Sequence, residues 1–215
     1  GGWPESNDDF FVTQWTNKGW VRGQGVFNQL SPTFDKDYSE SVAGIQVPLI
    51  THEIGQYSVY PDLTEISKYT GVLKPLNFMA VKNDLEKKKL LDKAPDYLMA
   101  SGKLAAILYK EEIERALKTD GISGFQLLDL HDFPGQGTAL VGLLNAFWES
   151  KGIIDGKAFR EFCSPVVPLL RFPKAVYKND EMFQAKIELC NYGNDILTNK
   201  TLHWDILDKG RSVKH

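Results

Sequence analysis

Two short apolar runs, each ending abruptly in ionisable residues, constrain the fold of this chain most strongly. The first covers residues 46–53 and ends in His52 and Glu53, and the second covers residues 122–128 and is followed by Asp129. Short runs rich in β-branched and apolar residues are typical of buried parallel strands. We therefore expect both runs to be strands of one parallel sheet.

Helical periodicity separates the two predicted strands. Residues 84–92 are charge-dense and helical in pattern, Pro95 interrupts, and apolar residues then recur along one helix face until Asp120 and Gly121 end it. A further helix is predicted over residues 138–150. The order strand, helix, strand, helix predicts an α/β fold with a parallel sheet and right-handed crossovers.

The polar clusters that follow the two predicted strands are the main indication of function. Parallel strands joined by helices place their sites at the carboxyl ends of the strands. We therefore predict that His52 and Glu53 lie at the end of a parallel strand, adjacent to the strand that ends at Asp129.

Beyond Cys163 the pattern changes from helical to alternating. Residues 165–173, 183–193 and 202–208 alternate apolar and polar positions, with Gly and Asn turns between them. This pattern predicts antiparallel strands with one face buried. We therefore divide the chain into residues 1–162 and 163–215, and expect the second part to begin an antiparallel β-sandwich.

Charge and hydropathy exclude two classes of partner. The 25 Lys and Arg residues are interleaved with 28 Asp and Glu residues and give a net charge of −3, so no basic footprint for nucleic acid is present. No uncharged stretch approaches the ~20 apolar residues of a membrane span, so none is expected. The chain begins Gly1-Gly2 with no basic or apolar leader, which indicates either processing or excision from a longer polypeptide.

Glu53 carries the chemistry that the sequence suggests. A carboxylate at a strand tip, with Gly55 leaving space beside it, can serve as a nucleophile or a general base. The alternative is a Glu that forms a salt bridge at a strand end. Amide and aromatic side chains nearby suit sugar binding, because flat apolar faces stack on C–H faces and amides bond to hydroxyls; core packing is the alternative for each aromatic. These side chains are Trp3, Trp15, Trp20, Gln56, Tyr57 and Tyr60.

The second polar cluster comprises Asp129, His131, Asp132 and the nearby Gln136. Hydrogen bonding to substrate hydroxyls is the favoured role. A metal site shared with the first cluster is an alternative, in which His52, Glu53 and His131 would converge on one ion, but no HxH pair or HExxH helix supports it. Phosphate-binding glycine motifs and a GxSxG elbow are also absent from the sequence.

Residues 48–57 resemble the seventh barrel strand of family-2 glycoside hydrolases and their relatives in the same retaining clan, where a run ending in Glu supplies the nucleophile. Residues 124–137 resemble the eighth strand and its loop in bacterial β-galactosidase-like members, and the chain from Ser164 onward resembles the β-sandwich that follows the barrel. The resemblance implies an α/β fold in which residues 1–162 are the C-terminal part of a (β/α)8 TIM barrel and residues 163–215 begin an immunoglobulin-like domain.

The resemblance also implies a function. Glu53 would be the nucleophile of a retaining glycoside hydrolase that acts on oligo- or polysaccharide, with no cofactor and no metal, in a periplasmic or secreted setting. The substrate-binding residues would be Trp15, Trp20, His52, Gln56, Tyr57, Asp129, His131, Asp132 and Gln136.

The sequence departs from the family pattern in three ways. The acid/base Glu of the clan follows an Asn, and no Asn-Glu dipeptide occurs in the 215 residues. About 250 residues make a whole barrel, so the early strands would be missing as well. The Trp that many members place on the eighth strand is not present at Leu127 or Leu128. We therefore expect a C-terminal fragment that needs the remainder of its parent polypeptide. A non-catalytic carbohydrate-binding or scaffold module is the alternative.

Overall fold

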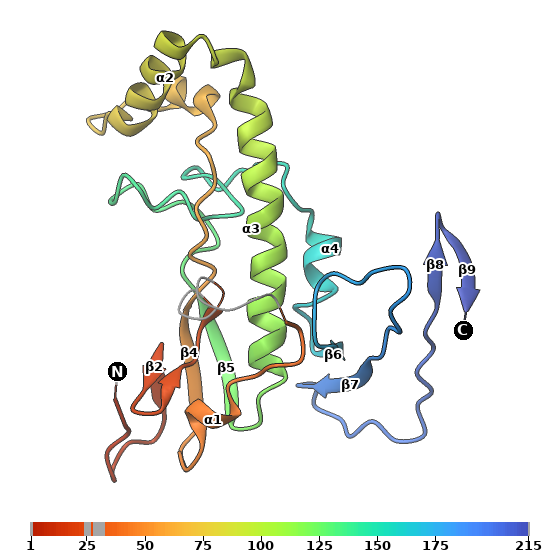
Figure 1. Cartoon of the computed structure of the whole chain (residues 1–215). Helices are drawn as coiled ribbons and strands as arrows, with labels where there is room; N and C mark the ends of the chain where they lie inside the picture. Colours follow the sequence, from red (N-terminus) through yellow and green to blue (C-terminus); the bar gives the residue numbers. More distant parts are fainter. Residues whose placement is uncertain (1, 24–26, 28–32, 215) are drawn as a thin grey trace.

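The structure is a computed structural model that describes residues 2–23, 27 and 33–214 (Figure 1). Its central element is a three-stranded parallel sheet in the order β1-β4-β5. The strands are β1 (Phe11–Thr13), β4 (Leu49–Ile54) and β5 (Ile122–Leu127). The two strands predicted from the apolar runs are confirmed, and they are parallel neighbours as expected.

A long helix, α3 (Ala94–Leu117), runs alongside β4 and β5 (Figure 1). Its apolar stripe packs on the sheet: Ala116 lies in a cluster with Leu49 and Ile122, and Ile113 lies in another with Ile54. Pro95 does not interrupt this helix but lies in its first turn, where the missing N–H would have no helical partner anyway.

The remaining short elements connect these parts. α2 (Leu76–Lys88) ends at Lys89, which adopts a left-handed conformation at φ 56°. The others are β2 (Trp15–Thr16), β3 (Gly19–Trp20), α1 (Ser39–Val42), η2 (Leu63–Lys68), η3 (Leu91–Lys93) and α4 (Gly156–Arg160).

The barrel prediction is wrong. The parallel sheet of the described residues has three strands, and β1 and β5 form its two edges, so the sheet does not close on itself. The pattern strand, helix, strand is common to open sheets and barrels and cannot distinguish them. The architecture is a mixed α/β fold with several short sheets.

The helix predicted over residues 138–150 is also wrong. In this segment Leu144 pairs with residues 130–132, where the Leu144 N–H donates to the Leu130 carbonyl (3.0 Å) and the Asp132 N–H to the Leu144 carbonyl (3.0 Å), and a turn follows at residues 145–149. Gly142 permits the approach, because a Cβ there would overlap the main chain of His131. Long-range pairing thus overrides the local helical pattern.

The C-terminal strands are confirmed, but the β-sandwich is wrong. β6 (Val166–Arg171) pairs antiparallel with β7 (Lys186–Asn191), and β8 (Ile206–Asp208) pairs with β9 (Arg211–Lys214). Each pair is a separate two-stranded sheet, and Figure 1 shows the β8–β9 hairpin standing apart at one end of the molecule. The boundary between residues 162 and 163 stays a prediction.

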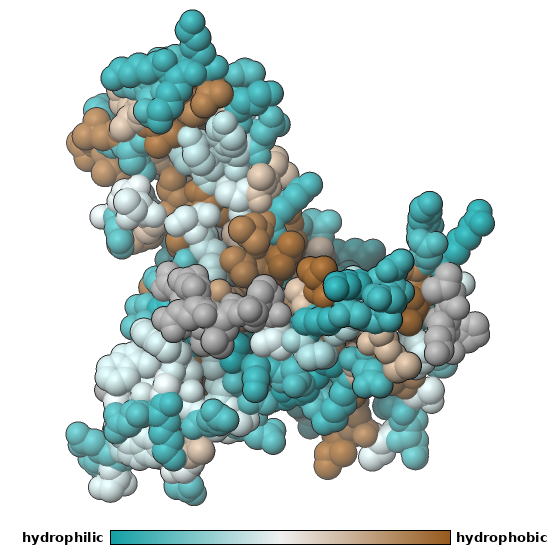
Figure 2. Space-filling model, viewed as in Figure 1, coloured by the Kyte–Doolittle hydropathy of each residue, from teal (hydrophilic) through white to brown (hydrophobic). Residues whose placement is uncertain are grey.

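Apolar side chains are exposed around the start of α2. Val72, Leu73 and Leu76 are exposed there, and Figure 2 shows brown surface among the teal at the upper end of the molecule, where α2 lies in Figure 1. No helix in the described parts of the chain combines the length and apolar character needed to cross a membrane.

Candidate active site

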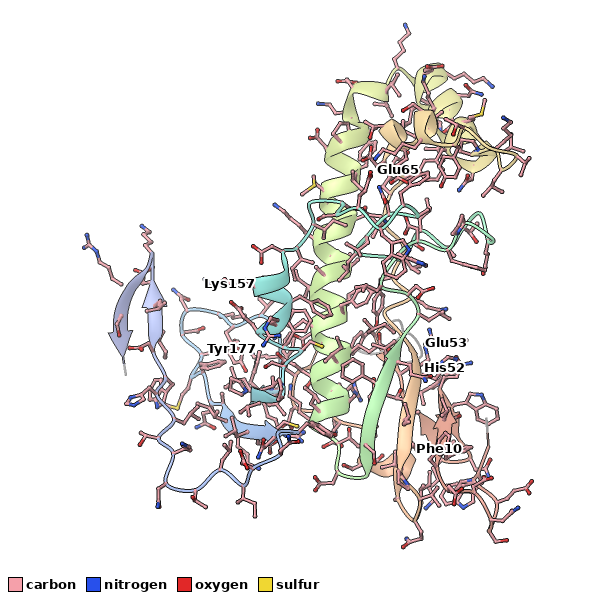
Figure 3. All side chains as sticks on the ribbon, turned by 180° about the vertical axis from the view of Figure 1, so that it is seen from behind. Phe10, His52, Glu53, Glu65, Lys157 and Tyr177 are labelled. Carbon is pink, nitrogen blue, oxygen red and sulfur yellow. The ribbon has the colours of Figure 1, made fainter. Side chains whose placement is uncertain are left out.

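Glu53 occupies the carboxyl end of β4, and the prediction that it lies beside the strand ending at Asp129 is confirmed. Ile54 is paired with Leu127 of β5, and the Leu128 N–H donates to the Ile54 carbonyl (2.9 Å). Figure 3 shows His52 and Glu53 together on the side of β4 that faces away from α3. The first cluster and the beginning of the second therefore follow neighbouring parallel strands at one edge of the sheet.

The backbone at the end of β4 adopts an unusual conformation. Glu53 has φ 61°, in the left-handed region that non-glycine residues rarely enter, and Gly55 follows at φ 91°. Such a conformation carries a cost of about 1–3 kcal/mol, and strained residues of this kind cluster at functional sites. The conformation of Glu53 is therefore an indication of function that the sequence pattern alone did not provide.

Arg22 holds the Glu53 carboxylate. Its buried guanidinium forms an ion pair with Oε2 of the partly exposed Glu53, and donates further hydrogen bonds to Oε1 of Gln14 (2.5 Å) and Oε1 of Gln56 (2.8 Å). A planar guanidinium fixes such partners in direction as well as distance. Arg22 thereby joins the ends of β1 and β4, and Gln56 supports Arg22 here.

The second carboxylate oxygen of Glu53 is less restrained. Oε1 lies 3.9 Å from Nε2 of His52, and the Glu53 side chain keeps 25% of its surface exposed. One oxygen is thus fixed while the side chain still reaches the surface. This arrangement suits a carboxylate nucleophile. The ion pair with Arg22, taken alone, suits equally a Glu53 that only forms a structural salt bridge at the end of the strand.

Glu112 of α3 binds the main chain next to both members of the Arg22–Glu53 pair. Its fully buried carboxylate accepts the main-chain N–H of Gly23, next to Arg22, and that of Gly55 (3.0 Å), two residues after Glu53. Burial raises the pKa of Glu112, and these hydrogen bonds and the Arg22 charge oppose that rise. One carboxylate therefore connects the two backbone segments that carry the ion pair.

Two tyrosines pack around this connection. The rings of Tyr57 and Tyr109 meet edge to face, with centroids 6.3 Å apart, and both are buried. Burial and the neighbouring Glu112 charge raise the pKa of Tyr57. The Tyr109 hydroxyl lies 2.5 Å from the Asp129 carbonyl oxygen, and its ring fills the space beside Gly55. The structure places Tyr57 in the core rather than at an open surface.

Trp15 and Trp20 form an exposed aromatic pair. They are cross-strand partners in the β2–β3 hairpin, and each keeps about two fifths of its surface exposed. The hairpin follows β1 directly, whose Thr13 pairs with Thr51 of β4, and it contacts α1. The hairpin thus presents two exposed indoles on the β1 side of the sheet.

The second cluster is divided by the structure. Asp129 is half-buried at the end of β5, whereas the Asp132 carboxylate is buried and accepts hydrogen bonds from the Lys151 ammonium (2.7 Å) and the Gly142 N–H (2.9 Å). Gln136 lies on an exposed loop and lines a separate cavity of about 160 Å³ next to α2. Asp129 therefore stays at the end of the strand that neighbours β4, and Asp132 is held in an ion pair.

His131 packs against an aromatic ring. Its imidazole meets the Trp148 indole edge to face, with ring centroids 4.3 Å apart. Within the described residues, no group of three or more His, Cys, Asp and Glu side chains is arranged to hold a metal ion. This observation gives no support to the alternative in which His52, Glu53 and His131 share one ion.

Sequence reasoning missed Arg22 and Glu112. The sequence did contain a signal for Arg22, because a charged residue between Val21 and Gly23, in an apolar and glycine-rich stretch, is unusual. No local signal marked Glu112, since an acidic residue in a helix is usually solvent-exposed.

Comparison with known proteins does not place this chain in a family. No protein-family model matches this chain, and no curated protein sequence matches it.

Proposed function

We propose that this chain carries the nucleophile of a retaining glycoside hydrolase and that Glu53 is that nucleophile. The observation that carries the proposal is the state of the Glu53 carboxylate, which is held through Oε2 by Arg22 yet remains partly exposed at the carboxyl end of a parallel strand. The left-handed backbone at Glu53 and the exposed indoles of Trp15 and Trp20 add support.

The proposed reaction is a double displacement. Glu53 attacks the anomeric carbon and forms a covalent glycosyl-enzyme, the bond to the leaving oxygen breaks, and water then attacks the same carbon and releases Glu53. A second carboxyl group, about 5–5.5 Å away, protonates the leaving oxygen and later activates the water. We assign that group to the remainder of the parent polypeptide, because the Asn-Glu dipeptide of the resembling family is absent from this sequence.

The surrounding residues have distinct roles in this proposal. Arg22 holds Glu53 oriented, so that little reorganisation is needed when the nucleophile attacks. Trp15 and Trp20 supply stacking surfaces for sugar rings, and His52 and Asp129 supply hydrogen bonds to hydroxyls. Gln56 acts through Arg22.

A non-catalytic carbohydrate-binding module is the second candidate. The exposed pair of Trp15 and Trp20 favours it, because such a pair binds sugar faces without any paired carboxylate. In that case Glu53 is a structural partner of Arg22.

Covalent trapping tests the proposal. The protein expressed from its complete gene is incubated with 2,4-dinitrophenyl 2-deoxy-2-fluoroglycosides of glucose, galactose, mannose and xylose, and its peptides are analysed by mass spectrometry. We expect one fluorosugar on the peptide that contains Glu53, no label in Glu53→Gln, and normal labelling in the exposed control Glu40→Gln. Labelling of another carboxylate contradicts the assignment, and sugar binding without labelling favours the binding module.

A further inference from the structure

The loop between η2 and α2 carries apolar side chains that the described residues leave uncovered. Val72 is fully exposed and Leu73 is 51% exposed, and a Cβ added at Gly71 would meet no atom within 4 Å among the described residues. Figure 1 shows that α2 and the loop before it form the outer end of the molecule. Aliphatic side chains in water do not stabilise a fold, and contiguous exposed apolar residues are typical of a contact site.

The first turn of α2 extends this surface. Leu76 and Met79 are 69% and 44% exposed, and they lie one turn apart on the side of the helix that faces away from the buried Phe78 and Leu85. A surface helix ordinarily has one apolar side, whereas α2 has a second one at its beginning. The loop and the helix together form one surface, here called the apolar tip, which comprises Val72, Leu73, Leu76 and Met79.

The apolar tip lies in a basic part of an acidic chain. Residues 66–83 contain Lys68, Lys74 and Lys82 but no Asp or Glu, although the whole chain has 28 acidic residues and a net charge of −3. Three further lysines follow at residues 87–89, where α2 ends. Lysines around an apolar surface indicate an anionic partner.

The ion pairs in this region leave the lysines accessible. Lys68 pairs with Glu149, and Lys82 lies 3.9 Å from Glu86, but all four side chains are between 39% and 51% exposed. Lys74 donates to a main-chain carbonyl (3.3 Å) and forms no ion pair within the described residues. Exposed ion pairs contribute little to stability, so these lysines can exchange their partners for other anions at small cost.

An anionic lipid surface fits these features better than an acidic protein does. Protein interfaces are depleted in lysine and enriched in arginine, and residues 66–83 contain three lysines and no arginine. At a bilayer surface a lysine keeps its ammonium group among the phosphates, while its stem and the neighbouring apolar side chains enter the interface. A projecting loop also reaches a lipid surface without needing a complementary recess.

We propose that the apolar tip docks on an anionic lipid bilayer. Its four apolar side chains enter the boundary between headgroups and acyl chains, and Lys74 with the neighbouring lysines contacts the lipid phosphates. The contact is peripheral and requires no membrane-spanning segment. It goes beyond the proposed function and holds the protein at a membrane surface whichever role Glu53 has.

Vesicle sedimentation tests the proposal with the protein expressed from its complete gene. One set of vesicles contains phosphatidylcholine alone, and the other contains equal amounts of phosphatidylcholine and phosphatidylglycerol. We expect the protein to sediment with the anionic vesicles at low salt, to bind the neutral vesicles at least about tenfold more weakly, and to lose binding as added salt screens the lysines.

Two matched pairs of variants locate the contact. Val72→Asp should weaken binding to the anionic vesicles about tenfold or more, whereas Val176→Asp, at an 80% exposed position in the C-terminal part, should change it by less than about twofold. Lys74→Glu should weaken binding about fivefold or more. Lys157→Glu makes the same change in net charge on α4, at the exposed residue labelled in Figure 3, and should alter binding by less than about twofold.

Equal binding to the two vesicle types, no binding to either, or equal losses within either pair of variants overturns the proposal. A polyglutamate column distinguishes the acidic protein partner. Retention on that column that Val72→Asp abolishes, without any binding to vesicles, assigns the apolar tip to an acidic protein and overturns the lipid contact. The melting temperatures of the variants should match that of the wild type, because the substituted side chains are exposed.

Discussion

The carboxylate of Asp132 lies 2.7 Å from the ammonium of Lys151, and both side chains are only 3% exposed. Burial raises the pKa of Asp132, while Lys151 opposes that rise. A buried pair of this kind makes each partner depend on the other, since removing one charge leaves the second uncompensated in the interior.

Asp132→Asn should therefore destabilise the protein strongly. The change leaves the Lys151 ammonium buried without its counter-charge, and we expect the free energy of unfolding to fall by about 3–5 kcal/mol. The half-buried Asp129 provides the matched control, and Asp129→Asn should alter that free energy by less than about 1 kcal/mol. Urea unfolding followed by tryptophan fluorescence measures both. Equal effects would mean that the Asp132–Lys151 pair is not buried in solution.

Glu112→Gln should impair catalysis more than folding. The amide keeps one oxygen acceptor but presents an NH2 group to the second main-chain donor, so either Gly23 or Gly55 loses its partner. Displacement of the segments that carry Arg22 and Glu53 should lower kcat about 10- to 100-fold in the proposed reaction.

Glu114→Gln is the control for that prediction. Glu114 is a buried carboxylate on the same helix, paired with Lys110 (2.8 Å) and remote from the Arg22–Glu53 pair. Its substitution should lower the melting temperature and leave kcat within about twofold. If Glu112→Gln keeps wild-type kcat while both variants lose similar stability, Glu112 has no role in positioning the site.

Sequence predicted the parts of the site that depend on local pattern. β4 and β5 were recognisable because their apolar runs are short and end in polar residues. Glu53 could be placed near Asp129 because the carboxyl ends of neighbouring parallel strands share one edge of a sheet. Both inferences need only the strand direction and the side-chain order.

The missed features depend on contacts between distant residues. Arg22 is 31 residues from Glu53 in the sequence, and Glu112 is 89 residues from Gly23. Asp132 was grouped with substrate-binding residues because its partner Lys151 becomes a neighbour only when residues 130–132 pair with Leu144. No local periodicity reports such contacts.

Gly55→Ala should be among the most destabilising small substitutions in the chain. The residue adopts φ 91°, and an added Cβ would overlap the Tyr109 ring, so both the backbone and the packing resist it. We expect a loss of roughly 2–4 kcal/mol in the free energy of unfolding. Gly71→Ala, at a position with no atom within 4 Å of an added Cβ, should change it by less than about 1 kcal/mol. A melting temperature of Gly55→Ala equal to that of Gly71→Ala would contradict the packing described at Tyr109.

Glu65 should make the stability of the protein depend on pH between about 4.5 and 7. The residue lies in η2, near the upper end of the molecule in Figure 3, and is 1% exposed; neither carboxylate oxygen has a hydrogen-bond partner among the described residues. Burial, with a smaller contribution from the Asp132 charge, raises the pKa of Glu65 from 4.5 to about 7. The folded state therefore binds the proton more tightly than the unfolded state does.

The sign of the effect follows from this difference. Between pH 4.5 and 7 the folded protein holds more protons at Glu65 than the unfolded protein, so this residue makes stability fall as the pH rises, by about 3 kcal/mol in all. Glu65→Gln cannot ionise and should remove that loss. Urea unfolding of both proteins should show the variant close to the wild type at pH 4.5 and more stable by about 2–3 kcal/mol at pH 8. A difference between the two proteins that stays constant from pH 4.5 to 8 would mean that Glu65 titrates with an ordinary pKa and is accessible to water.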